Sequence, residues 1–354
     1  MPLTQVEFVL VQSREFFCIL ENPNIKEKSA FEHLIMCRTP RPGVFLLFLV
    51  LVAPLGCMAG QCPPASGVAM QVLGSGGPIA DDGRASSAYL VWVDGKSRVL
   101  IDAGGGAFLR FAEARGDFRD LDFIGLSHFH VDHTADFPAL LKSGSFSNRS
   151  ESLTVAGPDG SAPFPGLHHF LASLFDPDTG AYAYLGDYLS GNGRLPKLNV
   201  IEVDSENIGP VPVYGDNDSP IQIDAMHVPH GIVPALAFRV RVGTEVIVFA
   251  SDQNGSKPEF IDFARDASLL VMHMPVPEGV TGIGRRLHAP PSVIGTIADA
   301  ADVKMLVISH LMGRSLYELH KNVDLVQSNF SGPVAVADDL SCYKTDEQEN
   351  RAWK

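Results

Sequence analysis

Four side chains that could bind a metal ion fall within six consecutive residues of the chain. They are His128, His130, Asp132 and His133, and they directly follow the apolar run 121–126. Imidazole nitrogens and carboxylate oxygens are ligands for zinc, manganese and iron. Because such polar groups are costly to place beside a buried strand unless a cation compensates them, the segment predicts a metal site.

The spacing of these residues favours two neighbouring metal positions. In an extended segment, side chains two residues apart point to the same side, so His128 and His130 can converge on one ion. Asp132 and His133 then turn towards a second position. Further candidates lie next to apolar runs elsewhere in the chain, and they are His227, His230, Asp252 and His310.

The residues alone do not decide between His227 and His230, which stand three positions apart. Either could complete the site, and the other would then be a supporting or packing histidine. A carboxylate such as Asp252 can bridge two cations, which is the arrangement used in two-metal hydrolysis. His273 follows another apolar run, and we expect it to be a supporting or core group.

Several segments resemble the metallo-β-lactamase superfamily, in the branch that contains ribonuclease Z, phosphodiesterases and some arylsulfatases. The resemblance covers about residues 68–316. Its most specific part is His288, because in that branch a histidine stands at the same distance before the last ligand, here His310. The other matching segments are 73–76 with Arg84, 101–104, 127–133 followed by 138–141, 156–160, His230 ahead of 237–240, 251–252, and the stretches 297–304 and 308–310 that follow His288.

The resemblance implies an α/β fold, namely the four-layer αββα sandwich of the metallo-β-lactamase type. It also implies two divalent cations, in the first place zinc, with manganese or iron as alternatives, and it favours His230 over His227. The implied ligands are His128, His130 and His230 for one ion, Asp132, His133 and His310 for the other, and Asp252 as the bridge.

The charges of such a centre imply a hydrolytic mechanism. Two cations that share a water molecule lower its pKa towards neutrality, so that a bridging hydroxide can attack phosphorus, sulfur or a carbonyl carbon. His288 would protonate the leaving oxygen or brace the transition state, and its alternative is a structural loop histidine. Asp132 would help to orient the water as well as bind metal. We therefore expect a small anionic ester as substrate, either a phosphodiester or an aryl sulfate.

Other functions stay open at this stage. One is hydrolysis of a lactone or β-lactam ring, although the ligand pattern differs from that of the common zinc β-lactamases. Another is a secreted, non-catalytic metal-binding protein. Nucleic acid is not expected as a partner, because the net charge of −14 attracts no polyanion. The short interval between His230 and Asp252 also leaves no room for the tRNA-gripping arm that ribonuclease Z carries.

Strands and helices of ordinary length must position these residues. With 45% hydrophobic and 19% charged residues, the composition is that of a folded globular protein. The glycine-rich and proline-rich range 143–220 is interpreted as an insertion that covers the site, with ordinary surface structure as the alternative. The predicted strands are 68–73, 88–93, 98–101, 121–126, 238–242, 245–250 and 305–308, and the predicted helices are 108–114 and 292–301.

The N-terminal part has the features of a targeting segment. The apolar run 44–56 follows Arg38 and Arg41, but at thirteen residues it is shorter than the roughly twenty needed to span a bilayer. This order is typical of a signal peptide, so we expect an exported protein, periplasmic or secreted, with no spanning segment after cleavage. A buried element or an uncleaved anchor is the alternative. Met36 competes with Met1 as the start.

We therefore divide the chain into an N-terminal extension with a signal peptide (1–62), a catalytic domain (63–345) and a polar tail (346–354). Cys57 resembles a lipoprotein cleavage site, which makes a lipid anchor an alternative to simple export. Cys62 and Cys342 could form a disulfide in an oxidising compartment or stay unpaired. The sequence leaves open whether the protein is a monomer or a homodimer.

Overall fold

The computed structural model describes residue 62 and residues 64–346. The predictions made for the apolar run 44–56, for Met36 and for Cys57 lie outside the described residues. Among the helices of the described part, none combines the length and the apolar composition that a bilayer crossing requires.

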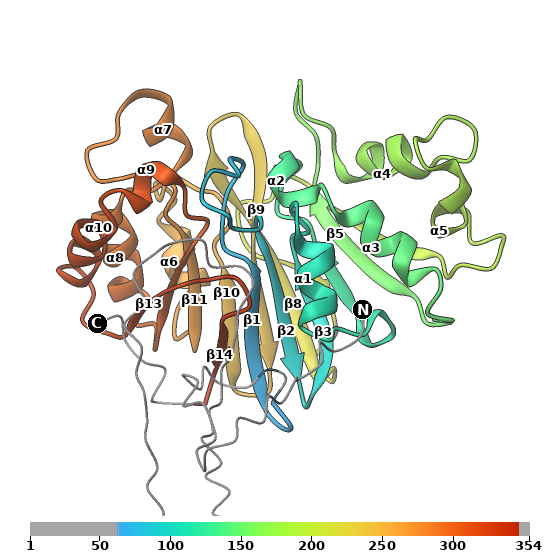
Figure 1. Cartoon of the computed structure of the whole chain (residues 1–354), viewed down its shortest axis with the longest axis horizontal. Coiled ribbons are helices and arrows are strands. Elements are labelled where there is room, and N and C mark those ends of the chain that lie inside the picture. The colour runs from blue at the N-terminus through green and yellow to red at the C-terminus, as the bar shows by residue number, and fades with distance from the viewer. Residues whose placement is uncertain (1–61, 63, 347–354) are drawn as a thin grey trace, which may run out of the picture. The chain divides into compact units, whose positions relative to one another are not determined.

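Seven strands form the first sheet (Figure 1). The first three strands make an antiparallel meander, and the next three continue it in parallel. The last strand of the chain pairs antiparallel with the first. In spatial order the strands are β14 (Cys342–Lys344), β1 (Val68–Gly74), β2 (Ala88–Val93), β3 (Lys96–Ile101), β4 (Phe123–Gly125), β5 (Leu153–Pro158) and β6 (Leu198–Val203).

Seven further strands form the second sheet. Its middle is a long antiparallel hairpin, and parallel strands extend it on one side. In spatial order the strands are β13 (Val334–Val336), β12 (Leu306–Ser309), β11 (Leu269–His273), β10 (Glu245–Phe249), β9 (Val233–Val242), β8 (Ile221–His230) and β7 (Val211–Tyr214).

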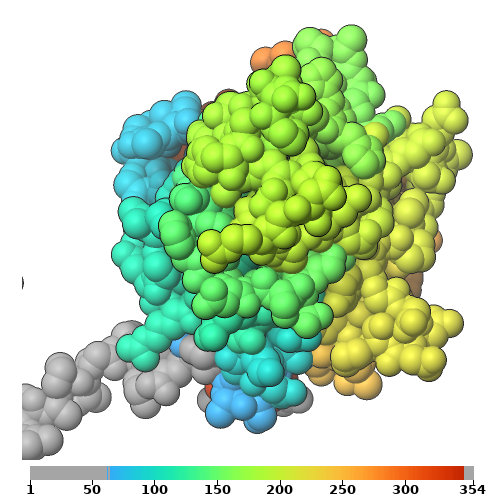
Figure 2. All heavy atoms as spheres, turned by 90° about the vertical axis from the view of Figure 1, so that its right-hand side faces the viewer, coloured from blue at the N-terminus to red at the C-terminus, as the bar shows by residue number. Residues whose placement is uncertain are grey.

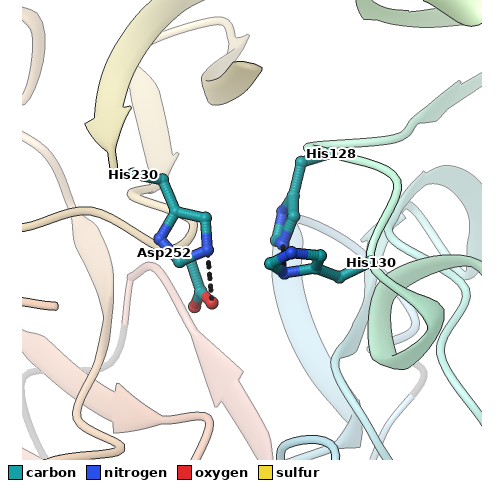
Figure 3. Close-up of side chains that lie close together, drawn as sticks. All are labelled: His128, His130, His230 and Asp252. Carbon is teal, nitrogen blue, oxygen red and sulfur yellow. Dashed lines mark hydrogen bonds and ion pairs between the residues drawn. The ribbon is translucent and has the colours of Figure 1, made fainter. Parts of the chain in front are cut away.

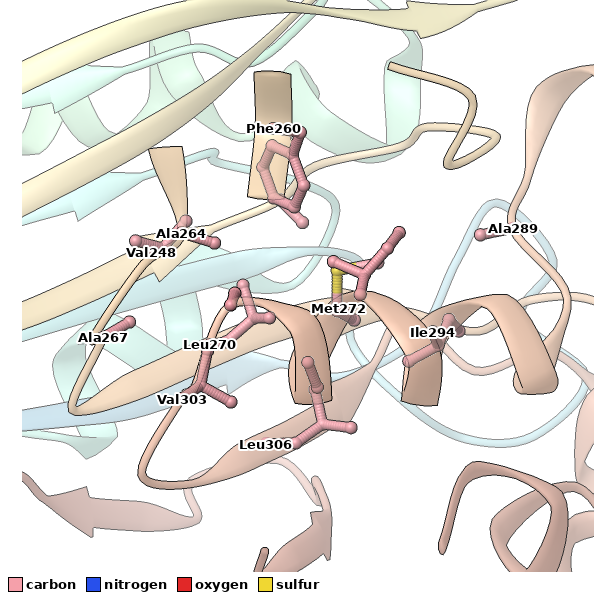
Figure 4. Packing of buried hydrophobic residues seen from close by; sticks show 14 of the residues in the cluster. Val248, Phe260, Ala264, Ala267, Leu270, Met272, Ala289, Ile294, Val303 and Leu306 are labelled. Carbon is pink, nitrogen blue, oxygen red and sulfur yellow. The ribbon is translucent and has the colours of Figure 1, made fainter. Parts of the chain in front are cut away.

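Helices cover the outer face of each sheet. The helices that pack on the first sheet are α1 (Ala107–Glu113), α3 (Phe137–Gly144), α4 (Leu167–Phe175) and α5 (Asp187–Ser190). Those that pack on the second sheet are α6 (Glu259–Phe263), α8 (Pro291–Ala300) and α10 (Leu319–Gln327), and Figure 4 shows this core around Phe260, Leu270 and Ile294. A third apolar cluster lies between the two sheets. The predicted four-layer αββα sandwich is confirmed.

The alternation of side chains along β1 shows why the sheets are buried on both faces. Val68, Met70 and Val72 belong to the cluster between the sheets, whereas Ala69 and Leu73 belong to the cluster under the helices. Successive side chains of a strand point to opposite faces, so a strand covered on both sides must be apolar at nearly every position. Full burial of each large apolar side chain stabilises the fold by about 1.5–3 kcal/mol.

The predicted strands and helices are present, with boundaries that differ by a few residues. The range 143–220, however, holds more than an insertion, because β5 and β6 belong to the first sheet and β7 to the edge of the second. Strand β6 is buried only at its two ends and lacks the alternation that identifies a strand in a sequence. In Figure 2 this green to yellow-green segment forms much of the surface facing the viewer.

Two cysteines link the ends of the described chain. Cys62, which precedes β1, forms a disulfide with Cys342 of β14, and their Cα atoms are 5.9 Å apart. Of the two alternatives that the sequence left open, the structure shows the disulfide. The bond spans a sequence separation of 280 residues, so it restricts the unfolded chain strongly.

We predict that Cys62→Ser lowers the free energy of unfolding by about 2–4 kcal/mol, because the unfolded chain loses its covalent constraint. Urea denaturation followed by tryptophan fluorescence measures the change. A reducing agent should destabilise the wild type to a similar degree and leave Cys62→Ser unaffected. Equal midpoints for the oxidised wild type and the variant would contradict a stabilising disulfide.

Candidate metal centre

The predicted metal-binding residues gather where strands of both sheets end. His128 and His130 follow β4, and His230 is the last residue of β8. Asp252 follows β10, and His310 comes directly after β12. Figure 1 shows the short helices α2 (Val131–Thr134), α7 (Gly282–Leu287) and α9 (Gly313–Leu316) at this same upper edge, beside the β8–β9 turn.

A first group of possible ligands consists of His128, His130, His230 and Asp252. One ligand atom from each of them lies within 4.8 Å of the others. Nε2 of His128 is 3.0 Å from Nδ1 of His130, and Nε2 of His230 is 3.6 Å from Oδ2 of Asp252. In Figure 3 the two histidines of the loop after β4 face His230 and Asp252 across a gap.

A second group consists of Asp132, His133 and His310, again with ligand atoms within 4.8 Å of one another. Nε2 of His310 is 3.2 Å from Nε2 of His133 and 3.2 Å from Oδ2 of Asp132. Asp132 and His133 reach this position because the chain turns into α2 after the extended residues 128–130.

The carboxylate of Asp252 lies between the two groups. Its Oδ2 faces His230 of the first group, and its Oδ1 is 3.5 Å from Nε2 of His310 of the second. Its side chain is buried, and a buried carboxylate is stable only with positive charge or hydrogen-bond donors around it. Asp252 therefore occupies the place that a bridging ligand needs.

The donor atoms fit a metal ion. Nδ1 of His230 donates a hydrogen bond to the carbonyl oxygen of Leu287 at 2.9 Å, so that Nε2 is the ring nitrogen left to bind a metal. That Nε2 is buried and has no hydrogen-bond partner, although it points into the first group. An unpartnered nitrogen lone pair among imidazoles and carboxylates matches the ligand set of zinc and related divalent ions.

The environment of the histidines also suits metal binding. Burial, together with the neighbouring imidazoles, lowers the pKa of His128 well below its usual range and lowers that of His130. Both rings are therefore neutral at pH 7, which is the form that binds a metal.

The second group carries more charge. Burial opposes the charge on Asp132, but His133 and His310 outweigh it and lower the pKa of Asp132 to about 2.

Asp102 supports the second group from behind. Its Oδ2 accepts a hydrogen bond from Nδ1 of His133 at 2.7 Å, and its two oxygens accept hydrogen bonds from the backbone N–H and the hydroxyl group of Ser127. The contact directs Nε2 of His133 towards His310. The sequence showed Asp102 only as part of a strand end, and the three glycines that begin two residues later, at Gly104, were the available signal of a close packing site.

His273 supports the centre on the other side. Its Nδ1 is hydrogen-bonded to Oδ1 of Asp252 at 2.7 Å, and its Nε2 lies 3.0 Å from the hydroxyl group of Tyr89. Tyr89 in turn donates a hydrogen bond to Ser309, the residue before His310. His273 therefore lies behind the centre, where a supporting group was expected.

The structure separates the two histidines that the sequence could not distinguish. His230 lies in the first group, whereas Nε2 of His227 is 3.3 Å from the carbonyl oxygen of Val203 and 4.0 Å from Oδ1 of Asp159. Since His227 has these other partners, only His230 is available to the first group.

His288 lies beside the centre at the end of α7. Its Nδ1 is 3.8 Å from Oδ2 of Asp252 and has no hydrogen-bond partner. Burial is the main cause that lowers the pKa of His288 to about 3. Together with His130, Asp132, His230, Asp252 and His310, it lines a cavity of about 400 Å³.

The comparisons with known proteins give one family and one fold. Residues 81–253 match the family model described as the metallo-beta-lactamase superfamily. Ribonuclease Z of Methanosarcina mazei is 24% identical over 297 residues, which cover 76% of this chain and 95% of that protein.

Two solved structures show the same fold. The metallo-beta-lactamase fold protein YhfI from Bacillus subtilis has a TM-score of 0.58 and 22% identity, and the match covers 78% of this chain and 98% of that one. Human tRNase Z, short form, has a TM-score of 0.60 and 18% identity, with 79% and 100% covered. At these identities the two structures establish the fold alone.

We predict that Asp102→Asn weakens metal binding about 10–100-fold, because the amide no longer fixes the orientation and tautomer of His133. Competition with a fluorescent chelator measures the affinity. Asp224→Asn is the matched control, since Asp224 is also largely buried but pairs with Arg241 away from the centre. Equal affinities for the wild type and Asp102→Asn would show that Asp102 does not support the site.

Proposed function

Because this chain belongs to the metallo-β-lactamase superfamily, we propose that it is an exported metal-dependent hydrolase that cleaves a small anionic ester, in the first place a phosphodiester. The proposal rests on one observation: the carboxylate of Asp252 lies between two groups of possible ligands, with Oδ2 near His230 and Oδ1 near His310. The ribonuclease Z relatives support a phosphodiester, since a ribonuclease cleaves that bond.

The proposed ligands are those that the structure brings together. His128, His130 and His230 would hold one cation, Asp132, His133 and His310 the other, and Asp252 would contact both. Zinc is the first choice, with manganese or iron as alternatives, given nitrogen and oxygen donors. Two such cations, when bound, supply activation of water and stabilisation of the charge that develops in the transition state.

Two side chains of the protein would orient the attacking water and assist the leaving group. Asp132 accepts a hydrogen bond from Nε2 of His310 and lines the cavity, where it would orient the attacking water. His288 stands beside Asp252 with an unpartnered ring nitrogen. Because its lowered pKa keeps the ring neutral at pH 7, His288 would donate a hydrogen bond from its ring N–H to the oxygen of the leaving group.

RNA cleavage is a second candidate, favoured by the ribonuclease Z relatives. The electrostatics oppose it, because a chain of net charge −14 does not attract a polyanion and Arg314 is the single lysine or arginine among the residues lining the described cavity. Export would also separate the enzyme from cellular tRNA. The proposal of export is supported by the disulfide between Cys62 and Cys342, since disulfides persist in oxidising compartments.

We predict that the zinc-loaded protein cleaves bis(p-nitrophenyl) phosphate faster than an aryl sulfate, a lactone, a cephalosporin or a precursor tRNA. Chelation should abolish the activity and zinc should restore it. His128→Ala should lower turnover by more than about 100-fold, because the loss of a ligand exceeds the effect of losing a supporting group. Fractions of native cells, assayed with the same ester, show whether the activity is exported.

His227→Ala is the matched control and should keep its activity, since His227 lies outside both ligand groups. Turnover that survives chelation, or that is unchanged in His128→Ala, would refute a metal-dependent reaction at this centre. A chelator-sensitive activity confined to the cytosol would refute export but not hydrolysis.

We predict that His288→Ala lowers kcat for the best ester about 10²–10³-fold, the usual contribution of a hydrogen-bond donor to the transition state, and leaves the zinc content unchanged. Steady-state kinetics and elemental analysis of the same sample test this. A loss of zinc together with activity would instead assign His288 to the support of the metal site, and a kcat within about twofold of the wild type would leave it without a role in catalysis.

A further inference from the structure

Apolar side chains form part of the lining of the cavity at the centre. Besides the ligands and His288, its lining includes Pro78, Val131, Leu287 and Met312. Val131 lies between the proposed ligands His130 and Asp132, yet its side chain is 76% exposed. A large apolar side chain kept open to solvent beside a polar centre is typical of a surface that binds an apolar group.

The apolar lining continues onto neighbouring loops. The ring of Phe164 lies 5.8 Å from the ring of His130. Ile232 follows His230 in the β8–β9 turn and is 72% exposed, and its carbonyl oxygen accepts a hydrogen bond from Ser161 of the loop that carries Phe164. Four separate segments therefore contribute apolar side chains: Val131 and Leu287 line the cavity, and Phe164 and Ile232 belong to loops next to it. We call them the apolar rim, and they are Val131, Phe164, Ile232 and Leu287.

One positive side chain accompanies the rim. Arg314 of α9 lines the cavity, and its Nε donates a hydrogen bond to the carbonyl oxygen of Pro275 at 2.7 Å, which fixes the guanidinium group. The other ionisable groups of the lining are the histidines and the carboxylates of the centre. A single arginine can hold one anionic group, whereas a nucleic acid needs a series of positive side chains along its phosphates.

We propose that the substrates are amphiphilic esters, in which one anionic phosphodiester group carries a bulky apolar alcohol or phenol. The apolar rim holds the apolar group, and Arg314 holds an anionic oxygen of the phosphorus centre. Water adds to phosphorus and the P–O bond to one alcohol or phenol breaks. The oxygen of that group leaves with a proton, and a phosphate monoester is the other product. The inference rests on the proposed hydrolytic function and adds to it the class of substrate.

Two synthetic esters test the role of the rim. Methyl p-nitrophenyl phosphate and phenyl p-nitrophenyl phosphate share their leaving group and their charge, so they differ only in the apolar group that stays on phosphorus. We expect the wild type to show a kcat/KM at least about tenfold higher for the phenyl ester, mainly through KM, given the size of apolar discrimination in pockets. The double variant Val131→Ser/Ile232→Ser should lower that ratio about tenfold.

Matched variants separate the rim from general surface effects. Ile208→Ser removes an isoleucine that is 73% exposed and belongs neither to the cavity lining nor to the apolar rim, and it should leave the ratio of the two esters unchanged. Arg314→Met should raise KM for both esters and leave their ratio unchanged. Arg286→Met, an exposed arginine of α7 outside the cavity lining, should alter neither.

A binding measurement distinguishes the failure of this inference from the failure of the proposed function. Calorimetry with the zinc-loaded protein should give a Kd about tenfold lower for phenylphosphonate than for methylphosphonate, whether or not any ester turns over. Equal Kd values, an unchanged ester ratio in the double variant, or a preference for precursor tRNA over both esters would overturn the inference. Tighter binding of phenylphosphonate without cleavage of any ester would overturn the hydrolytic function and keep the specificity of the cavity.

Discussion

The burial of the Asp252 carboxylate is the constraint on which the rest of the centre depends. Burial alone would raise the pKa of Asp252, but His310, His288 and the hydrogen bond from His273 hold that pKa well below its usual range. A charged carboxylate in this position must be surrounded by donors or cations. His273 and His310 reach it from strand ends of the second sheet. His133, whose Nε2 is 3.9 Å from Oδ2 of Asp252, reaches it from the segment after β4 of the first sheet, so the electrostatic requirement of one side chain links both sheets.

The backbone at these strand ends is held in an uncommon conformation. Asp102, Ser251 and His310 all have positive φ angles, at 60°, 58° and 52°, and each follows a strand directly or by one residue. Such a conformation costs of the order of 1 kcal/mol or more for a residue other than glycine. Close packing adds a second restriction, since a Cβ at Gly104 would lie 2.1 Å from the backbone oxygen of Asp132. The sheets therefore position the side chains at some cost in stability.

Much of this arrangement could be predicted from the sequence, because it is encoded locally. Apolar runs that end in histidine or aspartate identify both the strands and their chemistry, as they do for β4 and β12. The residues that the sequence did not reveal depend on tertiary contacts. Strand β6 has a weak pattern, since both of its ends but not its middle are buried. The link from Asp102 to His133 joins positions 31 residues apart, and no local spacing signals it.

The pairing of β14 with β1 has a consequence for the behaviour of the protein towards other copies of itself. Strand β1 is apolar on both faces. Without β14, its unpaired backbone N–H and C=O groups would form an exposed edge of the sheet. An exposed edge strand of this kind can pair with strands of other chains, which starts aggregation. The short β14 covers that edge, and the disulfide from Cys342 to the segment before β1 keeps it in place. The covalent link thus holds a short strand along the edge of β1, a role separate from that of the histidines.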